Sequence, residues 1–341
     1  MTDSRHDSWD APGLLPPSEP KRVARYRRLQ SWYREVQLGA PAGKFGSYDP
    51  LGSYLDPKAV KQQRDLNFLH PSAYEHAETR SIEVQAEGGA LDPTRLFHNM
   101  LSSMPMCFNL FGAMRGEHDA FLPVFTSLFD DEATAISEIV CEWAPPDADA
   151  RIGDRTAFDA VIFYEAGDQK RFIGIETKYT EPFSRRVYES QRYTDVTAGC
   201  GWFVHPESAA DSLKGPKSNQ LWRNVLLAAA LDSSGQHGRG SVAVVALDGD
   251  SGAETAVELV GSTLADSHID RLRLVSIETV LAAIDAMAPE LSWWATSFRR
   301  RYLRGDLPDD PSAARDPLGP VLGRPIFDTQ AAARASSAGT G

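Results

Sequence analysis

The sequence predicts an α/β fold with a mixed central sheet flanked by helices, and three observations predict it. First, residues 135–143, 157–165 and 171–181 are short segments of strand-like composition that follow one another closely. Second, residues 218–231 have the apolar spacing of an amphipathic helix. Third, residues 240–247 are an apolar run of the length of a buried strand. This order indicates an antiparallel meander, then a crossover helix that returns the chain to a further strand.

Helical additions are expected on both sides of this core. Residues 1–20 carry several prolines among Ser and Asp and are predicted to be disordered. We expect a helical N-terminal extension over residues 21–90, the core over 91–290, and a C-terminal helix with a flexible tail over 291–341.

Within the extension, residues 21–37 have helical spacing and residues 57–69 suit a short helix. The Gly- and Pro-rich segment 39–52 is predicted to be a loop. Irregular, helix-poor structure is expected from residue 70 to residue 89.

The remaining elements follow from the same spacing rules. A buried helix is predicted over residues 92–114, with Pro105 kinking or dividing it. The acidic, Pro-rich segment 144–154 is expected to be a loop. Further predictions are helices at 117–129, from about residue 184 to 199, at 277–287 and at 291–303, and a strand at 271–275.

Composition excludes several classes of protein. The chain has 341 residues, 42% of them hydrophobic, which is typical of a globular protein. No apolar run is long enough to span a bilayer, and the N-terminus lacks the pattern of a signal peptide, so a cytoplasmic protein without membrane contact is expected. The three cysteines are widely separated, which argues against structural zinc and a disulfide framework.

The net charge of −12 counts against general nucleic-acid affinity, but local basic runs are compatible with it. Residues 21–28 carry five cations, and residues 298–304 carry four. Each run is either a solvated helix face or a contact surface for phosphates.

Three charges interrupt the apolar hairpin formed by the second and third predicted strands. A tight turn at residues 166–169 joins the strands. Glu176 and Lys178 share one face of their strand, with Cα atoms roughly 7 Å apart, and the antiparallel partner can place Asp159 beside them. Buried charges need partners, and a divalent cation such as Mg²⁺ is one candidate. A structural ion-pair cluster is the alternative.

This element order, with Asp159, sixteen intervening residues and then Glu176-Thr177-Lys178, resembles the PD-(D/E)XK nuclease superfamily and its restriction-endonuclease-like fold. Residues 99–114 also look like a helix of a bacterial branch of restriction endonucleases. The resemblance of the core covers roughly residues 92–247. One departure is Phe158, which stands where the signature has proline.

The resemblance implies roles for individual residues. Asp159 and Glu176 would be carboxylate ligands of Mg²⁺ or Mn²⁺, and Thr177 would offer its backbone carbonyl. Lys178 would orient and help deprotonate the attacking water. Glu138, on the preceding strand, is the candidate for an additional acidic residue near the metal, with Glu117 second.

Other polar residues near the hairpin are candidates for contact with nucleic acid. Arg185, Arg186 and Arg192 follow the second hairpin strand directly. Gln220 lies on the next helix, where some members of the family carry a polar residue that faces the site. For Gln220 and Asn224, solvent-facing positions on an amphipathic helix are the alternative.

The expected function is therefore metal-dependent hydrolysis of DNA phosphodiester bonds, by an endonuclease in restriction, defence or DNA processing. Two alternatives stay open: a catalytically silent nucleic-acid-binding or assembly module of the same fold, and a nuclease directed at RNA. Cleavage of both DNA strands would make a homodimer plausible.

Overall fold

The computed structural model describes residues 12–303, and within these the chain divides into two compact units. Residues 12–69, 93–105 and 293–303 belong to the first unit. Residues 70–92 and 106–292 belong to the second, which contains the predicted sheet.

The second unit is built on a five-stranded sheet in the order β3-β4-β5-β6-β7. Strands β3, β4 and β5 pair antiparallel, whereas β5, β6 and β7 pair parallel. The predicted meander and crossover are thereby confirmed. The strand bounds are β3 Ala135–Trp143, β4 Phe158–Ala166, β5 Gln169–Lys178, β6 Arg239–Ala246 and β7 Leu272–Ser276.

The β4–β5 hairpin closes through a two-residue turn. Ala166 pairs with Gln169, which leaves Gly167 and Asp168 as the turn residues. Gly167 has a φ of 58°, a conformation that glycine adopts without the steric cost of a side chain. The turn fixes the register of the hairpin and hence the position of Asp159 relative to β5.

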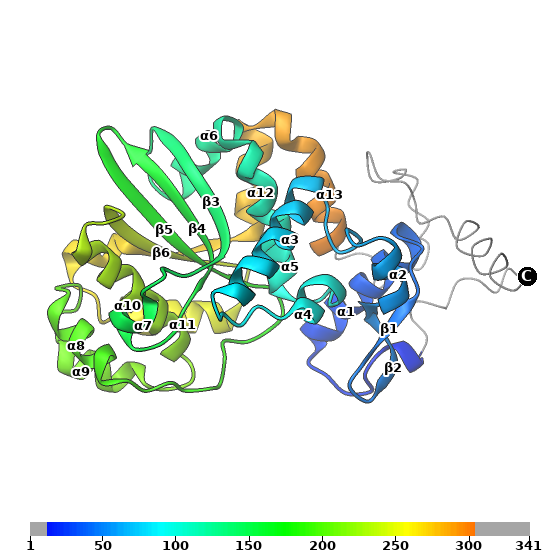
Figure 1. Ribbon diagram of the computed structural model, residues 1–341, viewed down its shortest axis with the longest axis horizontal. Coiled ribbons are helices and arrows are strands. Elements are labelled where there is room, and N and C mark those ends of the chain that lie inside the picture. Colours follow the sequence, from blue (N-terminus) through cyan, green and yellow to red (C-terminus); the bar gives the residue numbers. More distant parts are fainter. Residues whose placement is uncertain (1–11, 304–341) are drawn as a thin grey trace, which may run out of the picture. The chain divides into compact units, whose positions relative to one another are not determined.

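Helices cover both faces of this sheet (Figure 1). Helix α10 packs against β5 and β6, whereas α3 and α6 pack against β3. The helices of the second unit are α3 Pro71–Ala86, α6 His118–Leu128, α7 Ala148–Ile152, α8 Gln191–Gly199, α9 Pro206–Leu213, α10 Asn219–Ser234, α11 Ser251–Gly261 and α12 Ile277–Met287, with 3₁₀ turns η3 Gly112–Gly116, η4 Asp266–Arg271 and η5 Pro289–Leu291.

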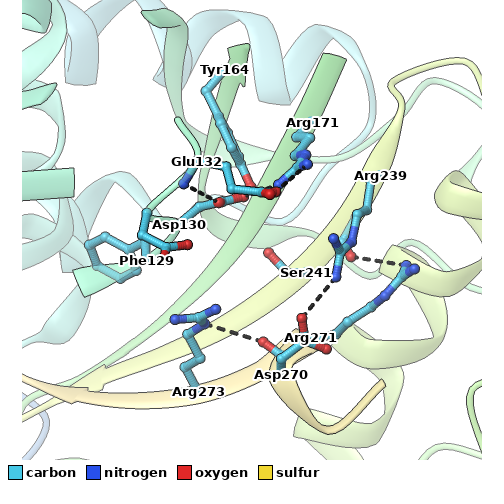
Figure 2. A pocket seen from close by; sticks show the side chains of 12 residues that line it. Phe129, Asp130, Glu132, Tyr164, Arg171, Arg239, Ser241, Asp270, Arg271 and Arg273 are labelled. Atoms are coloured by element: carbon cyan, nitrogen blue, oxygen red, sulfur yellow. Dashed lines mark hydrogen bonds and ion pairs between the residues drawn. The ribbon is translucent and has the colours of Figure 1, made fainter. Parts of the chain in front are cut away.

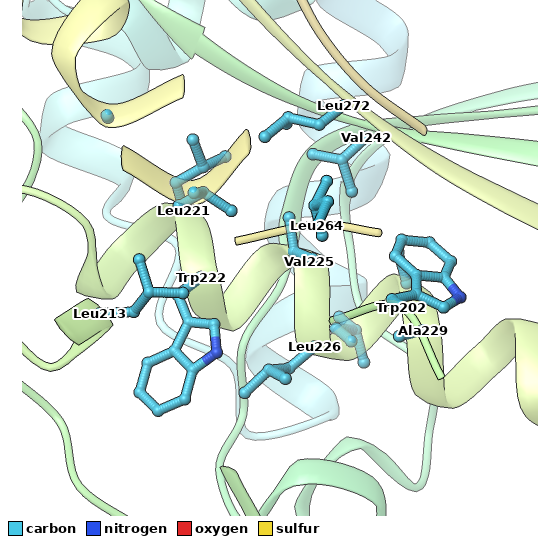
Figure 3. Close-up of a cluster of buried hydrophobic side chains, with 14 of the residues drawn as sticks. Trp202, Leu213, Leu221, Trp222, Val225, Leu226, Ala229, Val242, Leu264 and Leu272 are labelled. Atoms are coloured by element: carbon cyan, nitrogen blue, oxygen red, sulfur yellow. The ribbon is translucent and has the colours of Figure 1, made fainter. Parts of the chain in front are cut away.

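The hydrophobic core between α10 and the sheet fixes the helix in place (Figure 3). Val225 of α10 and Val242 of β6 are fully buried in it, together with Trp202 and Leu264 from neighbouring segments. Burial of one such side chain contributes about 1.5–3 kcal/mol. This packing holds the first turn of α10 against the end of β5.

The first unit contains helices and a two-stranded sheet. Its elements are η1 Pro12–Leu14, α1 Lys21–Trp32, the π-helical turn η2 Tyr33–Gln37, β1 Ala42–Phe45, β2 Tyr48–Leu55, α2 Pro57–Gln62, α4 Pro93–His98 and α13 Ser292–Tyr302, while α5 Ser103–Leu110 contains the boundary between the units. Arg301, from one of the basic runs, is fully buried and donates to the carbonyl of Asn67 at 2.7 Å. This arginine therefore holds the unit together and is neither solvated nor open to phosphates.

Two predictions for the N-terminal extension are wrong. Residues 39–52 were expected to be a loop, but most of them form the β1–β2 hairpin, whose irregular pairing and glycines hide the strand pattern. Residues 70–89 are not helix-poor, because α3 occupies Pro71–Ala86. The buried face of α3 includes Ala73, His76, Ala77 and Arg80, so the sequence lacks the large apolar residues that mark a helix.

Other boundaries differ from expectation. The helix predicted at 92–114 is divided into α4 and α5, and Pro105 lies in the first turn of α5, where proline is tolerated. Helix α8 begins at Gln191 rather than near residue 184. The predicted loop 144–154 contains α7, the predicted helix 57–69 ends at Gln62, and α9 and α11 were not predicted.

Helices at 117–129, 218–231, 277–287 and 291–303 are confirmed within one to three residues at each end, and the strand at 271–275 within one. Disorder was predicted for residues 1–20, but residues 12–20 include the 3₁₀ turn η1, and Glu19 forms an ion pair with Arg27 at 3.0 Å. Residues 1–11 and the flexible tail predicted beyond residue 303 lie outside the described residues. No helix between residues 12 and 303 is both long and apolar enough to cross a membrane.

Candidate active site

Strands β4 and β5 stop pairing with each other before either strand ends. Their last pair is Ala160 with Ile175. Beyond it, β4 stays paired with β3 as far as Phe158, and β5 stays paired with β6 as far as Lys178. Beyond this pair, β4 is therefore held by β3, and β5 by β6. Side chains lie between β4 and β5 where backbone hydrogen bonds would otherwise join the two strands.

The side chain of Asp159 lies in this gap between β4 and β5. Its Oδ2 accepts hydrogen bonds from the backbone N–H of Thr177 at 2.7 Å and from the Thr177 hydroxyl at 2.8 Å. The carboxylate thus replaces a backbone carbonyl as the acceptor for β5. Sequence reasoning expected Thr177 to contribute only its carbonyl, because the end of the β4–β5 ladder is not visible in the pattern.

Glu176 is buried, and both of its carboxylate oxygens accept hydrogen bonds. Its Oε1 accepts from Lys178 Nζ at 2.6 Å and from Gln220 Nε2 at 2.6 Å, and its Oε2 accepts from Asn224 Nδ2 at 2.7 Å. The residue is 2% exposed. Three donors compensate for the loss of hydration of this carboxylate.

Lys178 completes the buried pair. Its Nζ lies 4.5 Å from the centre of the Phe183 ring, besides its contact with Glu176. Burial lowers the pKa of Lys178, but the attraction of Glu176 and Asp159 outweighs this effect, so the pKa is raised above its usual value. Lys178 is therefore a charged hydrogen-bond donor at neutral pH.

The pKa of Asp159 is raised, whereas the pKa of a carboxylate paired with a cation is normally lowered. The pKa of Asp159 is raised to about 6, first because the carboxyl group is removed from solvent and second because the negative charge of Glu176 is close. Lys178 and the two bonds from Thr177 only partly offset these effects. With two carboxylates and one ammonium, the cluster carries one negative charge in excess.

Helix α10 supplies the amides that hold Glu176. Gln220 and Asn224 are four residues apart, so they lie on the same face of the helix, which faces the sheet. Gln220 also accepts a hydrogen bond from the backbone of Ser184 at 2.8 Å. The structure thus places both residues against the site, and the solvent-facing alternative is wrong for Asn224, which is 2% exposed.

Two carboxylates of the cluster keep oxygen lone pairs available to a divalent cation. Between residues 12 and 303, Asp159 Oδ1 accepts no hydrogen bond, and Glu176 Oε2 accepts one, so both retain lone pairs. Mg²⁺ commonly takes one or two carboxylates and keeps several waters. The residues fit such an ion, although no group of three or more His, Cys, Asp or Glu side chains in the described part of the chain is arranged to hold a metal.

Glu138 lies away from this cluster. It pairs with Phe163, four residues along β4 from Asp159, which corresponds to roughly 13 Å. The residue of β3 opposite Asp159 is instead Glu142, since its neighbours Cys141 and Trp143 pair with Ala160 and Phe158. Glu117, the second acidic candidate, directly precedes α6, and its backbone N–H donates to the Met114 carbonyl at 3.0 Å.

Phe158, which departs from the family signature, has a structural role. The residue is fully buried, and its ring lies over Gly174 of β5, where an added Cβ would come within 2.4 Å of the ring. Its ring also stacks parallel to that of Trp143. Phe158 and Gly174 therefore form a packed pair directly beside Asp159.

The three candidate arginines are exposed near the site. Arg185 and Arg186 lie in the segment between β5 and α8, and Arg192 lies in the first turn of α8. The Arg186 and Arg223 guanidinium groups lie 4.6 and 4.1 Å from the centre of the Tyr188 ring. These positions are compatible with contact to phosphates.

A second charged cluster lies toward the turn end of the same hairpin, around a cavity of about 270 Å³ (Figure 2). Arg171 pairs there with Asp130 at 2.9 Å and with Glu132 at 2.6 Å. Arg239 pairs with Asp270 at 2.8 Å. We refer to this group as the Arg171 cluster. Its carboxylates each face a guanidinium group, so it resembles a structural ion-pair network.

Comparison with known proteins agrees with the resemblance of the sequence. No curated protein and no solved structure matches the chain. The family model described as the PD-(D/E)XK nuclease superfamily matches residues 17–304. Because this match covers most of the chain and the sheet has the mixed topology expected of a restriction-endonuclease-like core, the chain belongs to the PD-(D/E)XK nuclease superfamily.

Proposed function

We propose that the protein is a metal-dependent endonuclease that hydrolyses phosphodiester bonds of DNA, acting in the cytoplasm in restriction, defence or DNA processing. The observation that carries the proposal is the buried Glu176–Lys178 pair with the electrostatically strained Asp159 beside it. Membership of the superfamily supports hydrolysis of nucleic acid, since its members generally use divalent metals for this reaction.

Asp159, Glu176 and the carbonyl of Thr177 would hold Mg²⁺ or Mn²⁺. A bound ion of this kind supplies neutralisation of phosphate oxygens and a more acidic water. Gln220 and Asn224 fix the orientation of Glu176, so its free lone pair points in a defined direction.

Lys178 has the role of a positioned donor. Its ammonium group would hydrogen-bond the attacking water and the negative charge that develops on the phosphate. Arg185, Arg186 and Arg192 would contact neighbouring phosphates, and Gln220 could reach the substrate from its position at the rim. Cleavage of both strands would require two such sites, as in a homodimer.

The test is cleavage of separate DNA and RNA substrates with Mg²⁺, with Mn²⁺ and with chelator. We expect metal-dependent cleavage of DNA that falls by at least about a hundredfold in Asp159→Ala, Glu176→Ala and Lys178→Ala. Lys170→Ala is the matched control, because Lys170 is an exposed lysine on the same strand. Cleavage of RNA alone would redirect the proposal to an RNA nuclease.

One observation favours the catalytically silent alternative. Both oxygens of Glu176 accept hydrogen bonds within the protein, as those of a purely structural carboxylate would. Binding of DNA or RNA without turnover in either metal, with binding unchanged in Lys178→Ala, would support a binding module and contradict the enzyme.

A further inference from the structure

The positive charges of the chain are concentrated in the first of its two compact units. The described residues of this unit contain 14 Lys and Arg against 5 Asp and Glu, which is a net charge of +9. The described residues of the second unit contain 16 Lys and Arg against 34 Asp and Glu, which is a net charge of −18. The overall acidity of the chain therefore conceals one strongly basic unit. A charge asymmetry of this kind is typical of chains that bind nucleic acid or a membrane surface.

The candidate active site belongs to the acidic unit. Duplex DNA carries one negative charge per about 1.7 Å of its axis, so a unit with a net charge of −18 repels it during approach. Arg185, Arg186 and Arg192 offer only local contacts within this unit. The described residues that can attract a polyanion over longer distances are therefore those of the first unit.

Some cations of the first unit hold its own fold. Arg34 and Arg301 are buried, and they donate to backbone carbonyl groups at 2.9 and 2.7 Å. Arg27 pairs with Glu19 at 3.0 Å. These three arginines are engaged within the protein and are not open to a partner.

Other cations of this unit are exposed on two helices, α1 and α2. They form no ion pair with any residue between 12 and 303, and they are Lys21, Arg25, Lys58 and Lys61. Arg25 lies 5.9 Å from the centre of the neighbouring Tyr26 ring, a contact that leaves its charge unneutralised. All four side chains are therefore available to an anionic partner.

The packing of α1 turns its two exposed cations outward. The side chain of Arg27 meets β2, where it donates to the Ser53 hydroxyl at 2.7 Å. Lys21 and Arg25 lie about 120° and 160° around the helix from Arg27, and about 40° from each other. They therefore share one face of α1, on the side directed away from β2.

The stability of α1 does not account for these cations. The helix begins with Lys21 and Arg22, has no acidic residue in its first turn, and has no side-chain hydrogen bond at its N-cap. The helix dipole disfavours positive charge at this end. A partner that carries fixed negative charges gives the arrangement a function that the isolated helix does not.

We propose that the first unit binds the phosphate backbone of duplex DNA through the exposed cations of α1 and α2. This inference rests on the proposed function for the choice of DNA, and it adds the surface that recruits the substrate to a chain with an acidic catalytic unit. Contacts with phosphates carry no sequence information, so this surface raises affinity and the rate of association for any sequence.

The test is the salt dependence of binding to a labelled DNA duplex, measured by fluorescence anisotropy in chelator. Lys21→Gln combined with Arg25→Gln removes the exposed cations of α1, and Lys58→Gln combined with Lys61→Gln removes those of α2. Each pair should weaken binding about tenfold and lower the slope of log Kd against log salt concentration by about two, because each lost phosphate contact lowers it by about 0.9. Glutamine has a helix propensity close to those of Lys and Arg, so both helices should stay folded.

The matched control removes two exposed cations from the second unit. Lys170→Gln combined with Arg239→Gln changes the net charge by the same amount, and both residues are exposed at the turn end of the β4–β5 hairpin. We expect the slope of the control to equal that of the wild type. If both helix pairs also keep the slope of the wild type, the basic face of the first unit is only solvated and the inference fails.

Cleavage separates this inference from the proposed function. None of the four helix residues belongs to the catalytic cluster, so the single-turnover rate at saturating protein should be unchanged, with more protein needed for half-saturation. Cleavage by the wild type without any slope change in the helix pairs would overturn the inference and leave the nuclease proposal standing. A lowered slope without cleavage in Mg²⁺ or Mn²⁺ would support the inference and contradict the enzyme. Binding to phosphatidylglycerol vesicles but not to duplex DNA would assign the basic face to a membrane and overturn the inference.

Discussion

The two ends of the β4–β5 hairpin each carry a buried cluster of charges, but the clusters differ in balance. In the Arg171 cluster, burial raises the pKa of Asp130, but hydrogen bonds from Tyr164 and Arg171 outweigh this, so the pKa is lowered. At the other end, the pKa of Asp159 is raised to about 6. The same sheet thus contains one carboxylate that its surroundings stabilise as an anion and one that they do not.

This difference in charge balance indicates that the two clusters have different roles. A structural ion-pair network pairs each carboxylate with a cation, as Asp130 and Glu132 are paired with Arg171. The Asp159 cluster keeps an excess negative charge that no residue between 12 and 303 neutralises through an ion pair with Asp159. A folded protein keeps an unfavourable excess of negative charge of this kind mainly at a site where a further positive group binds.

The largest expected effect is on stability, where the same substitution should have opposite signs at the two ends. Asp159→Asn keeps an acceptor for Thr177 and removes the unfavourable charge, so we expect the free energy of unfolding at pH 7 to rise by up to about 3 kcal/mol. Asp130→Asn loses charge-assisted hydrogen bonds and should lower it by about 1–3 kcal/mol. Urea unfolding at pH 7 measures both.

The pH dependence sharpens this prediction. A carboxyl group whose folded pKa is raised destabilises the folded state once the unfolded state can ionise, above about pH 4, and the cost is complete above pH 6. The advantage of Asp159→Asn should therefore vanish as the pH falls from 6 to 4. For Asp130, whose pKa is lowered, the wild type should lose its own advantage as the pH falls below about 4. Equal signs for both variants would remove the distinction between the clusters.

Much of the candidate site is predictable from the sequence, because it depends on the spacing of residues within one hairpin and one helix. Alternation places Glu176 and Lys178 on one face, and a two-residue turn fixes the hairpin register around Asp159. Gln220 and Asn224 share a helix face by spacing alone, although the pattern does not show that this face meets the sheet.

Two features could not be predicted from the sequence. One is the register between strands that are distant in the chain, and the other is a helix whose buried face consists of small and polar residues. Glu138 was expected near the metal, whereas the β3 residue opposite Asp159 is Glu142, because the long connection between β3 and β4 does not fix their register, which also contains a bulge. Helix α3 was missed because its buried face carries alanines and polar residues instead of a large apolar stripe.

An intermediate effect is expected from Asn224. Asn224→Ala leaves Glu176 Oε2 without its donor, so we expect the cleavage rate to fall about tenfold and the metal concentration for half-maximal rate to rise. Ser241→Ala, which changes a residue that lines the cavity at the Arg171 cluster, is the control and should change neither quantity. Titration of the cleavage rate with Mn²⁺ measures both, and identical curves for the two variants would show that Asn224 does not orient Glu176 for the reaction.

The smallest effect is expected from single exposed arginines. Arg185→Ala and Arg192→Ala should each weaken DNA binding two- to fivefold and reduce the slope of log Kd against log salt concentration by about one. Arg239→Ala, at the Arg171 cluster, should leave the slope unchanged. Fluorescence anisotropy over a range of salt concentrations gives these slopes, and a slope change in Arg239→Ala alone would move the DNA contact to the other end of the sheet.

The most direct test of the central claim is the rate of DNA cleavage by Asp159→Asn and Asp130→Asn in Mg²⁺, at a temperature where both variants are folded. The account predicts that Asp159→Asn, the more stable variant, loses at least about a hundredfold in rate, whereas Asp130→Asn, the less stable one, stays within a few-fold of the wild type. Full activity in Asp159→Asn, or an equal loss in both variants, would contradict it.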